Sequence, residues 1–231
     1  MRLNRFIGKY DLSKNEIEII DPKTIKQIRA VLRLEIGDKI ILSDGKGQEA
    51  EVTLEFLSSE KITGTVVKNF RARTTLAGKI VNLYLAILKK ENFELAVQKA
   101  VECGVSKIIP VITERTIKTG LNIPRLEKII LEASEQCGRS IVPTLSPILD
   151  FKDAIFGAEG EKIIFHLGGK EYAPDKNAKE ISIFVGPEGG FTENEIKLAK
   201  DSSFTVASLG ALTLRGETAA IVGTYRAVHG I

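Results

Sequence analysis

With 231 residues, 43% of them hydrophobic and 27% charged, the chain has the composition of an ordinary globular protein of one or two domains. The net charge is +3, and all of the excess positive charge falls in residues 1–75, which carry 14 Lys and Arg against 11 Asp and Glu. No apolar run approaches the roughly 20 residues that span a bilayer. The two cysteines lack metal-ligand spacing, and the two histidines have too few partners to build a zinc site. We therefore expect a cytoplasmic protein with no membrane partner and no bound metal.

Residues 1–75 are predicted to form a small β-rich domain with one helix. The helix begins at Asp21, a capping residue, and has Pro22 at its first position. Apolar alternation and a glycine-containing turn then predict strands at 39–43, 48–57 and 61–67. A threonine-rich segment after these strands is typical of a linker, and we place the domain boundary near residue 75.

Basic side chains of this first domain could together neutralise the backbone phosphates of a nucleic acid. A solvated charged face explains the same residues equally well, because a net charge of +3 is a weak bias. The residues in question are Arg2, Arg5, Lys26, Arg29, Arg33, Arg71 and Arg73.

From Lys79 onward, short apolar runs alternate with helix-like segments, a pattern typical of a mostly parallel α/β sheet. The strands are predicted at 80–88, 107–113, 163–167, 181–185 and 204–209. The last helix is expected to begin near Glu217 and to turn an apolar stripe inward. That stripe consists of Ile221, Val222, Tyr225 and Val228.

Residues 181–226 contain two successive units, each made of a strand, a glycine-containing loop and a helix. The three glycines of loop 186–190 permit positive φ and close approach of the backbone to a ligand. Thr192 and Glu195 form a capping box that begins the next helix. Tight turns alone would explain one such loop. Two in succession, both at the carboxyl ends of strands, favour a small-molecule site.

Several short motifs occur in a specific order and spacing along the chain. They include Gln98-Lys99-Ala100-x-Glu102-x-Gly104-Val105, Gly186-Pro187-Glu188-Gly189-Gly190-Phe191 and Leu214-Arg215-x-Glu217-Thr218-Ala219. In these motifs, and over nearly its whole length, the chain resembles the RsmE family, the 16S ribosomal RNA uridine-N3 methyltransferases of the knotted SPOUT class.

The resemblance implies an α/β fold with a mostly parallel sheet and a carboxyl-terminal trefoil knot, preceded by a PUA-like RNA-binding β-barrel. The barrel would occupy residues 1–75 and the methyltransferase domain residues 76–231. A homodimer is implied, with 16S ribosomal RNA or the small ribosomal subunit as its partner. S-adenosyl-L-methionine would be held by three loops, through His166, Leu167, Gly168, Gly186, Pro187, Glu188, Gly189, Gly190, Leu209, Gly210, Leu214, Arg215, Glu217 and Thr218.

Methylation of uridine at N3 requires removal of an imide proton and stabilisation of the resulting anion. We expect Arg215 to stabilise the anion, and either Glu188 or Glu217 to accept the proton. Each residue also has a structural interpretation. Glu188 could order its loop through a hydrogen bond, Glu217 could be an acid favoured by the helix dipole, and Arg215 could form an ion pair with one of the two acids.

Three other functions compete with this one. Methyl transfer to the ribose 2′-oxygen would use the same fold, and an RNA-binding protein without catalysis would use the basic face alone. An enzyme with a phosphate-containing cofactor is disfavoured, because the sequence has neither a GxGxxG nor a GxxxxGK[ST] pattern.

Overall fold

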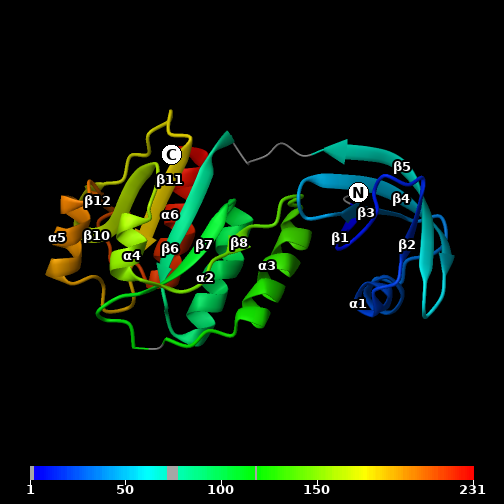
Figure 1. Cartoon of the computed structure of the whole chain (residues 1–231), viewed down its shortest axis with the longest axis horizontal. Helices are drawn as coiled ribbons and strands as arrows, with labels where there is room; N and C mark the ends of the chain where they lie inside the picture. The colour runs from blue at the N-terminus through cyan, green and yellow to red at the C-terminus, as the bar shows by residue number, and fades with distance from the viewer. Residues whose placement is uncertain (1–2, 72–77, 118) are drawn as a thin grey trace. The chain divides into compact units, whose positions relative to one another are not determined.

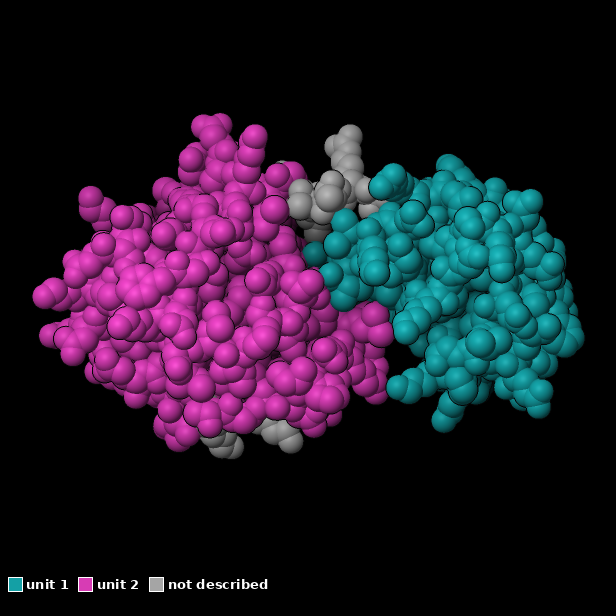
Figure 2. All heavy atoms as spheres, in the orientation of Figure 1, with its two compact units in different colours: residues 1–74, 134–142 teal, residues 75–133, 143–231 magenta. Residues whose placement is uncertain are grey.

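The computed structural model describes residues 3–71, 78–117 and 119–231, which form two compact units (Figure 1). The first unit consists of Met1–Thr74 with Ser134–Val142, and the second of Thr75–Ala133 with Pro143–Ile231 (Figure 2). Arg2 and Arg73, two of the candidate RNA-binding residues, lie outside the described residues.

A five-stranded sheet with the order β1-β3-β4-β5-β2 forms the first unit. The β1 and β3 strands are parallel and the other pairs antiparallel, and buried residues alternate with half-buried ones from Ala50 to Leu54 of β4. Its apolar core includes Ile40, Leu42, Val52 and Leu54, all 0–1% exposed. The strands are β1 (Asn4–Ile7), β2 (Glu16–Ile19), β3 (Lys39–Ser43), β4 (Gln48–Leu57) and β5 (Ile62–Arg71).

The predicted helix of this unit begins as expected and ends differently. The Asp21 carboxylate accepts a hydrogen bond from the Thr24 backbone N–H at 2.8 Å and caps α1 (Pro22–Lys26). The chain then continues as a π-helix, η1 (Gln27–Val31). The buried Ile25 and Ile28 side chains attach both segments to the sheet.

Residues 134–142, from the middle of the chain, pack within the first unit. The Ile7 backbone N–H donates to Glu135 Oε1 at 2.7 Å, and the Val142 N–H donates to the Gly45 carbonyl at 2.9 Å. The turn between β3 and β4, which contains Gly45, thus pairs with a segment far away in the sequence. No local pattern in residues 1–75 indicates this contact.

In the second unit, a sheet with the order β12-β10-β11-β6-β7-β8 runs from β12 at the left to β8 at the right of that unit in Figure 1, and β9 also pairs with β7. Every pair is parallel, which explains why the strands read as continuous apolar runs. The strands are β6 (Ile80–Ala86), β7 (Lys107–Ile112), β8 (Thr144–Leu145), β9 (Leu149–Asp150), β10 (Glu161–Glu171), β11 (Glu180–Val185) and β12 (Thr205–Ser208).

Helices lie against both faces of this parallel sheet. On one face, α4 and α5 bury Phe151, Ala154 and Ala199 against Tyr84 and Phe184 of the strands. On the other face, α6 packs on β6, β11 and α2. The helices are α2 (Lys90–Cys103), α3 (Ile123–Cys137), α4 (Phe151–Phe156), α5 (Glu193–Asp201) and α6 (Gly216–His229). Among the helices in the described ranges, none is long and apolar enough to cross a membrane.

The expected inward face of α6 is confirmed at Val228, which is 2% exposed, and is wrong at its other three positions. Tyr225 is 46% exposed, and Ile221 and Val222 are only half-buried. Small residues face the sheet instead, because the helix approaches it closely: a Cβ on Gly223 would lie 2.5 Å from the Phe165 ring. The residues that are buried along α6 are Gly216, Glu217, Ala220, Gly223, Thr224, Ala227 and Val228.

Candidate functional site

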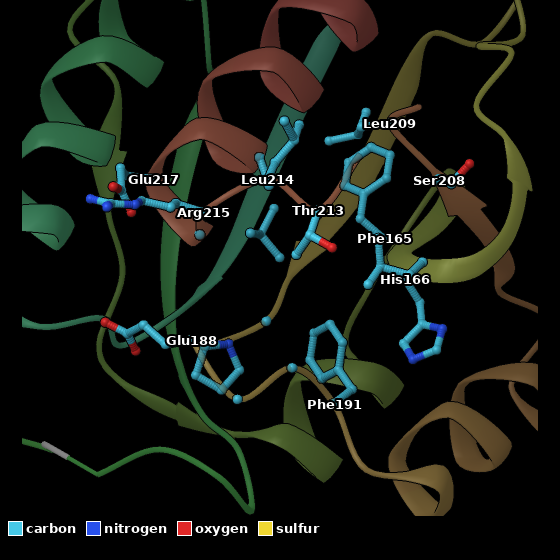
Figure 3. Close-up of a pocket in the computed structure, with 18 of the residues that line it drawn as sticks. Phe165, His166, Glu188, Phe191, Ser208, Leu209, Thr213, Leu214, Arg215 and Glu217 are labelled. Carbon is cyan, nitrogen blue, oxygen red and sulfur yellow. The ribbon is translucent and has the colours of Figure 1, made fainter. Parts of the chain in front are cut away.

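A cavity of about 610 Å³ lies in the second unit (Figure 3). Loops that follow β6, β7, β11 and β12 contribute to its wall, together with Phe165 to Leu167 of β10. The carboxyl ends of parallel strands meet at one edge of a sheet, which is where ligands bind in folds of this kind. The cavity therefore lies where the two glycine-containing loops predict a small-molecule site.

The cavity brings together all of the candidate ligand-binding residues except Gly168 and Thr218, which are not part of its lining. Three further residues of the lining, Lys89, Asn92 and Arg115, are not among those that the sequence motifs indicate. Each of these follows the end of a strand, β6 or β7, so the rule that pointed to the later loops could have found them as well.

The loop from Gly186 to Gly190 is a tight turn closed by a hydrogen bond from the Gly190 N–H to the Pro187 carbonyl at 2.8 Å. Gly190 has φ +67°, a conformation that residues with a Cβ adopt only at a cost. The predicted capping box follows directly. Thr192 Oγ1 accepts from the Glu195 N–H at 3.2 Å, and Glu195 Oε2 accepts from the Thr192 N–H at 2.8 Å.

A second loop, between β7 and α3, supports this turn from outside. The other carboxylate oxygen of Glu195 accepts a hydrogen bond from the Glu114 backbone N–H at 2.9 Å. Next to it, Arg115 Nη1 donates to the Gly189 carbonyl at 2.7 Å. Because Glu195 is only 3% exposed, both of its oxygens are used away from water, and Glu195 thereby ties the loop between β7 and α3 to the start of α5.

The start of α6 lies against the same loop. A Cβ on Gly216 would stand 2.8 Å from Leu88 Cδ2 and 3.5 Å from the Gly186 carbonyl oxygen. A side chain at position 216 would have to displace the buried Leu88 side chain, so a glycine suits the close approach of α6 to the segment after β6. The start of α6 therefore lies close to the segments that follow β6 and β11.

The two candidate proton acceptors differ in their surroundings. Glu188 is exposed, and its Oε1 accepts a hydrogen bond from the Lys89 backbone N–H at 3.0 Å, which ties two loops of the cavity together. Glu217 is only 8% exposed, and its buried Oε2 has no hydrogen-bond partner within the described part of the chain. A buried carboxylate oxygen without a partner is costly, so the observation points to a donor that a ligand supplies.

Arg215 occupies the N-cap position of α6, and its exposed side chain makes no capping hydrogen bond. The alternative of an ion pair with Glu188 or Glu217 is not realised among the residues that the structure describes, since neither pair is within 4.0 Å. Figure 3 shows Arg215 and Glu188 on one side of the cavity and His166 on the opposite side. There, His166 Nδ1 accepts from the Gly168 N–H at 3.1 Å, within the part of β10 where the pairing with β12 shifts register between Phe165 and Lys170.

Two other kinds of site find no support. Burial raises the pKa of the Cys103 thiol, with the Glu102 charge acting in the same direction, so a nucleophilic thiolate is disfavoured at neutral pH. Over residues 3–71, 78–117 and 119–231, no group of His, Cys, Asp and Glu side chains is arranged to hold a metal ion.

The basic residues of the first unit fall into two groups. Arg5 is half-buried and forms an ion pair with Glu49, with 2.7 Å between Nε and Oε1. The other described candidates have exposed side chains: Lys26, Arg29, Arg33 and Arg71.

Comparison with known proteins connects both units to one family. Residues 78–226 match the model of an RNA methyltransferase domain, and residues 20–67 match that of an RNA methyltransferase PUA domain. The chain is 29% identical over 233 residues to the ribosomal RNA small subunit methyltransferase E of Rickettsia conorii, covering 96% of this chain and 93% of the relative. It is 32% identical over 164 residues to the protein of that name from Mesomycoplasma hyopneumoniae, covering 68% of this chain and 72% of the relative.

The fold is shared as well. The crystal structure of the ribosomal RNA small subunit methyltransferase E from Neisseria gonorrhoeae, bound to S-adenosyl methionine, superimposes with a TM-score of 0.87 at 27% identity. The match covers 96% of this chain and 95% of that one. These findings confirm the mostly parallel α/β fold and the PUA-like domain expected from the sequence motifs. The chain belongs to the RsmE family of ribosomal RNA methyltransferases.

Proposed function

We propose that this chain transfers the methyl group of S-adenosyl-L-methionine to N3 of a uridine in 16S ribosomal RNA. The observation that carries the proposal is the convergence of the loops that follow β6, β7, β11 and β12 on a cavity of about 610 Å³. The relative from Neisseria gonorrhoeae is bound to S-adenosyl methionine, and the relatives from Rickettsia conorii and Mesomycoplasma hyopneumoniae are named for the small-subunit ribosomal RNA. Both facts support the same cofactor and the same class of RNA here.

The lining of the cavity fits this cofactor. Phe165, Leu209 and Leu214 offer apolar surface to a purine ring and a thioether chain. Around Gly190 and Gly210 the backbone borders open space, because a Cβ at either position would meet nothing within 4 Å. When bound, S-adenosyl-L-methionine supplies an activated methyl group, so the protein's task reduces to positioning and electrostatics.

Two side chains suit the reaction at uridine N3. The exposed guanidinium of Arg215 carries a charge that no described acid neutralises, and it lines the cavity. It would stabilise the negative charge that develops over N3, O2 and O4 when the imide proton leaves. Glu217 has a buried oxygen without a partner, whereas Glu188 already accepts a backbone hydrogen bond. We assign the proton-accepting role to Glu217 and the loop-ordering role to Glu188.

RNA is proposed to bind the first unit, which matches the RNA methyltransferase PUA domain. Lys26, Arg29, Arg33 and Arg71 have exposed side chains there. Arg5 is a weaker candidate, because Glu49 already neutralises its charge.

Three further properties complete the proposal. The segment from Leu209 to Gly216 returns from edge strand β12 past Gly186 to α6, a path that supports the carboxyl-terminal knot. Partly exposed apolar residues on α6, Ile221, Val222 and Tyr225, support a homodimer in which a second copy covers them. We also propose the cytoplasm, where ribosomal RNA is found, as the compartment.

Mass spectrometry of digested RNA tests the reaction. Small-subunit RNA incubated with the chain and S-adenosyl-L-methionine is expected to yield 3-methyluridine. Ribose-methylated nucleosides in its place would show that the chain is a 2′-oxygen methyltransferase. RNA binding without any calorimetric signal for S-adenosyl-L-methionine would identify a binding protein without catalysis.

Replacing Gly190 by Val is expected to abolish binding of S-adenosyl-L-methionine and leave the chain folded. The reason is conformation and not space: φ is +67° and the position is open, and a β-branched residue strongly disfavours positive φ. Isothermal calorimetry measures the binding and circular dichroism the fold. Gly190→Asn is the matched control and should retain more affinity, because Asn adopts the left-handed region more readily. Unchanged affinity of the Val variant would remove this turn from the cofactor site.

A further inference from the structure

One peptide group in the wall of the cavity, between Gly189 and Gly190, is hydrogen-bonded at both of its ends. Its N–H donates to the Pro187 carbonyl at 2.8 Å and closes the turn of loop 186–190. Its carbonyl, at the opposite end, accepts from Arg115 Nη1 at 2.7 Å. Hydrogen bonds at the two ends of one peptide group polarise and strengthen each other. The plane of this peptide, which directly precedes the positive φ of Gly190, is therefore fixed from two sides.

Arg115 reaches this carbonyl by passing over Gly189. A Cβ at position 189 would lie 3.3 Å from Arg115 Cδ and 3.5 Å from its Cβ, and the three nearest heavy atoms all belong to this arginine. The φ of Gly189 is not in the left-handed region. A glycine at position 189 therefore provides space for the arginine and is not needed for the backbone conformation.

The backbone that carries Arg115 is itself held in place. Thr116 Oγ1 accepts from the Thr113 N–H at 2.9 Å, and the Thr116 N–H donates to the Thr113 carbonyl at 3.1 Å, so the two threonines close a turn. Within this turn, the Glu114 N–H donates to the buried Glu195 carboxylate at 2.9 Å. The arginine thus extends from a turn that hydrogen bonds fix on both sides of it.

The charge of Arg115 has no acidic partner in the described ranges. Its side chain is exposed, and no carboxylate there lies within 4.0 Å of it. The bond to the Gly189 carbonyl is therefore the interaction that orients this guanidinium. A hydrogen bond from a charged donor is stronger than one between neutral groups.

We propose that Arg115 is a positioning residue of the cofactor site: by holding the Gly189–Gly190 peptide it keeps loop 186–190 in the conformation that binds S-adenosyl-L-methionine, without contacting the reacting atoms. The inference rests on the proposed function in its choice of ligand. A loop that is ordered before the ligand arrives spares the free energy of ordering it on binding. Two other roles compete: a bond that only stabilises the fold, and a direct contact with an RNA phosphate.

Arg115→Met in the full chain tests the positioning role, because methionine keeps an unbranched stem over Gly189 and has no donor for its carbonyl. The dissociation constant of S-adenosyl-L-methionine, measured by calorimetry without RNA, should rise about five- to twentyfold, as for one lost hydrogen bond. S-adenosyl-L-homocysteine, which lacks the transferred methyl group, should lose the same factor. At saturating cofactor, kcat should stay within about threefold of normal, and the melting temperature within about 2 °C.

Gly189→Ala tests the same contact from the other side. Its Cβ would displace the Arg115 stem without straining the backbone, so cofactor affinity should fall by a similar factor. If the two residues act through one contact, the double variant should bind about as weakly as the weaker of the two single variants. Losses that multiply in the double variant would show two independent effects and overturn the inference.

Two further variants serve as rescue and control. Arg115→Lys should recover part of the affinity, because its ammonium can donate one hydrogen bond to the Gly189 carbonyl. Arg125→Met is the matched control. Arg125 is also an exposed arginine of the second unit, and its Nε lies 2.6 Å from Glu94 Oε1, but it is not part of the cavity lining. Its replacement should leave cofactor affinity unchanged.

Unchanged affinity for S-adenosyl-L-methionine in Arg115→Met would overturn the inference. Combined with a lower melting temperature, it would identify a bond that only stabilises the fold. Combined with a shallower salt dependence of RNA binding, it would identify a phosphate contact. A decrease in kcat of more than about tenfold at saturating cofactor would instead place Arg115 in the chemical step.

The proposed function fails separately from this inference. If the unmodified chain binds S-adenosyl-L-methionine and Arg115→Met weakens that binding, but no 3-methyluridine is formed, the assigned reaction falls and the positioning role stands. If 3-methyluridine is formed and Arg115→Met binds the cofactor normally, the positioning role alone falls.

Discussion

Replacing Glu217 by Gln is expected to lower kcat for RNA methylation by about 10²–10⁴-fold, the usual loss when a general base is removed. The amide has nearly the same shape as the carboxylate but cannot take up the imide proton at neutral pH. Stability should be unchanged or higher, because Glu217 Oε2 is buried without a partner among the described residues and a neutral group is less costly to bury than a charged one. Single-turnover kinetics with saturating cofactor measure the chemical step.

Glu188→Gln is the matched control for this prediction. Its amide oxygen can still accept the hydrogen bond from the Lys89 N–H, so the loop contact survives and kcat should stay near normal. A large loss of kcat in Glu188→Gln and none in Glu217→Gln would reverse the assignment. A loss of affinity for S-adenosyl-L-methionine in Glu217→Gln, in parallel with kcat, would instead identify Glu217 as a cofactor ligand.

Features that a few neighbouring residues determine could be predicted from the sequence. The Asp21 cap, the Thr192–Glu195 capping box and the five predicted strands of the parallel sheet all occur where the sequence predicts them, whereas the two-residue strands β8 and β9 were not predicted. Each depends on hydrogen bonds or burial within a short segment. The place of the cavity follows as well, because parallel strands bring the loops at their carboxyl ends to one edge.

Features that depend on close approach between distant segments could not be predicted. The hydrophobicity of Tyr225 favoured an inward position for this residue. In the structure Gly223 faces inward instead, because Phe165 leaves no room for a side chain there, and Tyr225 is 46% exposed. The second hydrogen bond of Glu195, to the Glu114 N–H, is likewise not visible from a motif that already explains the residue as a helix cap. The packing of residues 134–142 in the first unit has the same origin, since its partners lie about 90 residues or more away.

Replacing Arg215 by Ala is expected to lower kcat by about 10²–10³-fold, which is comparable to the loss of one oxyanion-stabilising donor. A positive charge at the amino end of α6 is disfavoured by the helix dipole by roughly 0.3–1 kcal/mol, and arginine has only donors to offer where the unsatisfied helix groups are donors too. Arg215 makes no capping bond, and neither Glu188 nor Glu217 lies within ion-pair distance of it in the described structure.

Arg215 thus makes no capping hydrogen bond and no ion pair with Glu188 or Glu217 that would stabilise the described fold. Its positive charge would, however, stabilise a uracil anion in the cavity. Arg215→Ala should therefore keep the melting temperature and the affinity for S-adenosyl-L-methionine close to those of the unmodified chain, measured by calorimetry. Arg215→Lys should recover part of the lost rate, since it keeps the charge without the planar pair of donors. Lys197→Ala, an exposed cation on α5 outside the cavity lining, is the matched control and should have no effect on kcat. Loss of stability in proportion to activity would identify Arg215 as a structural residue, and a near-normal kcat would remove it from the mechanism.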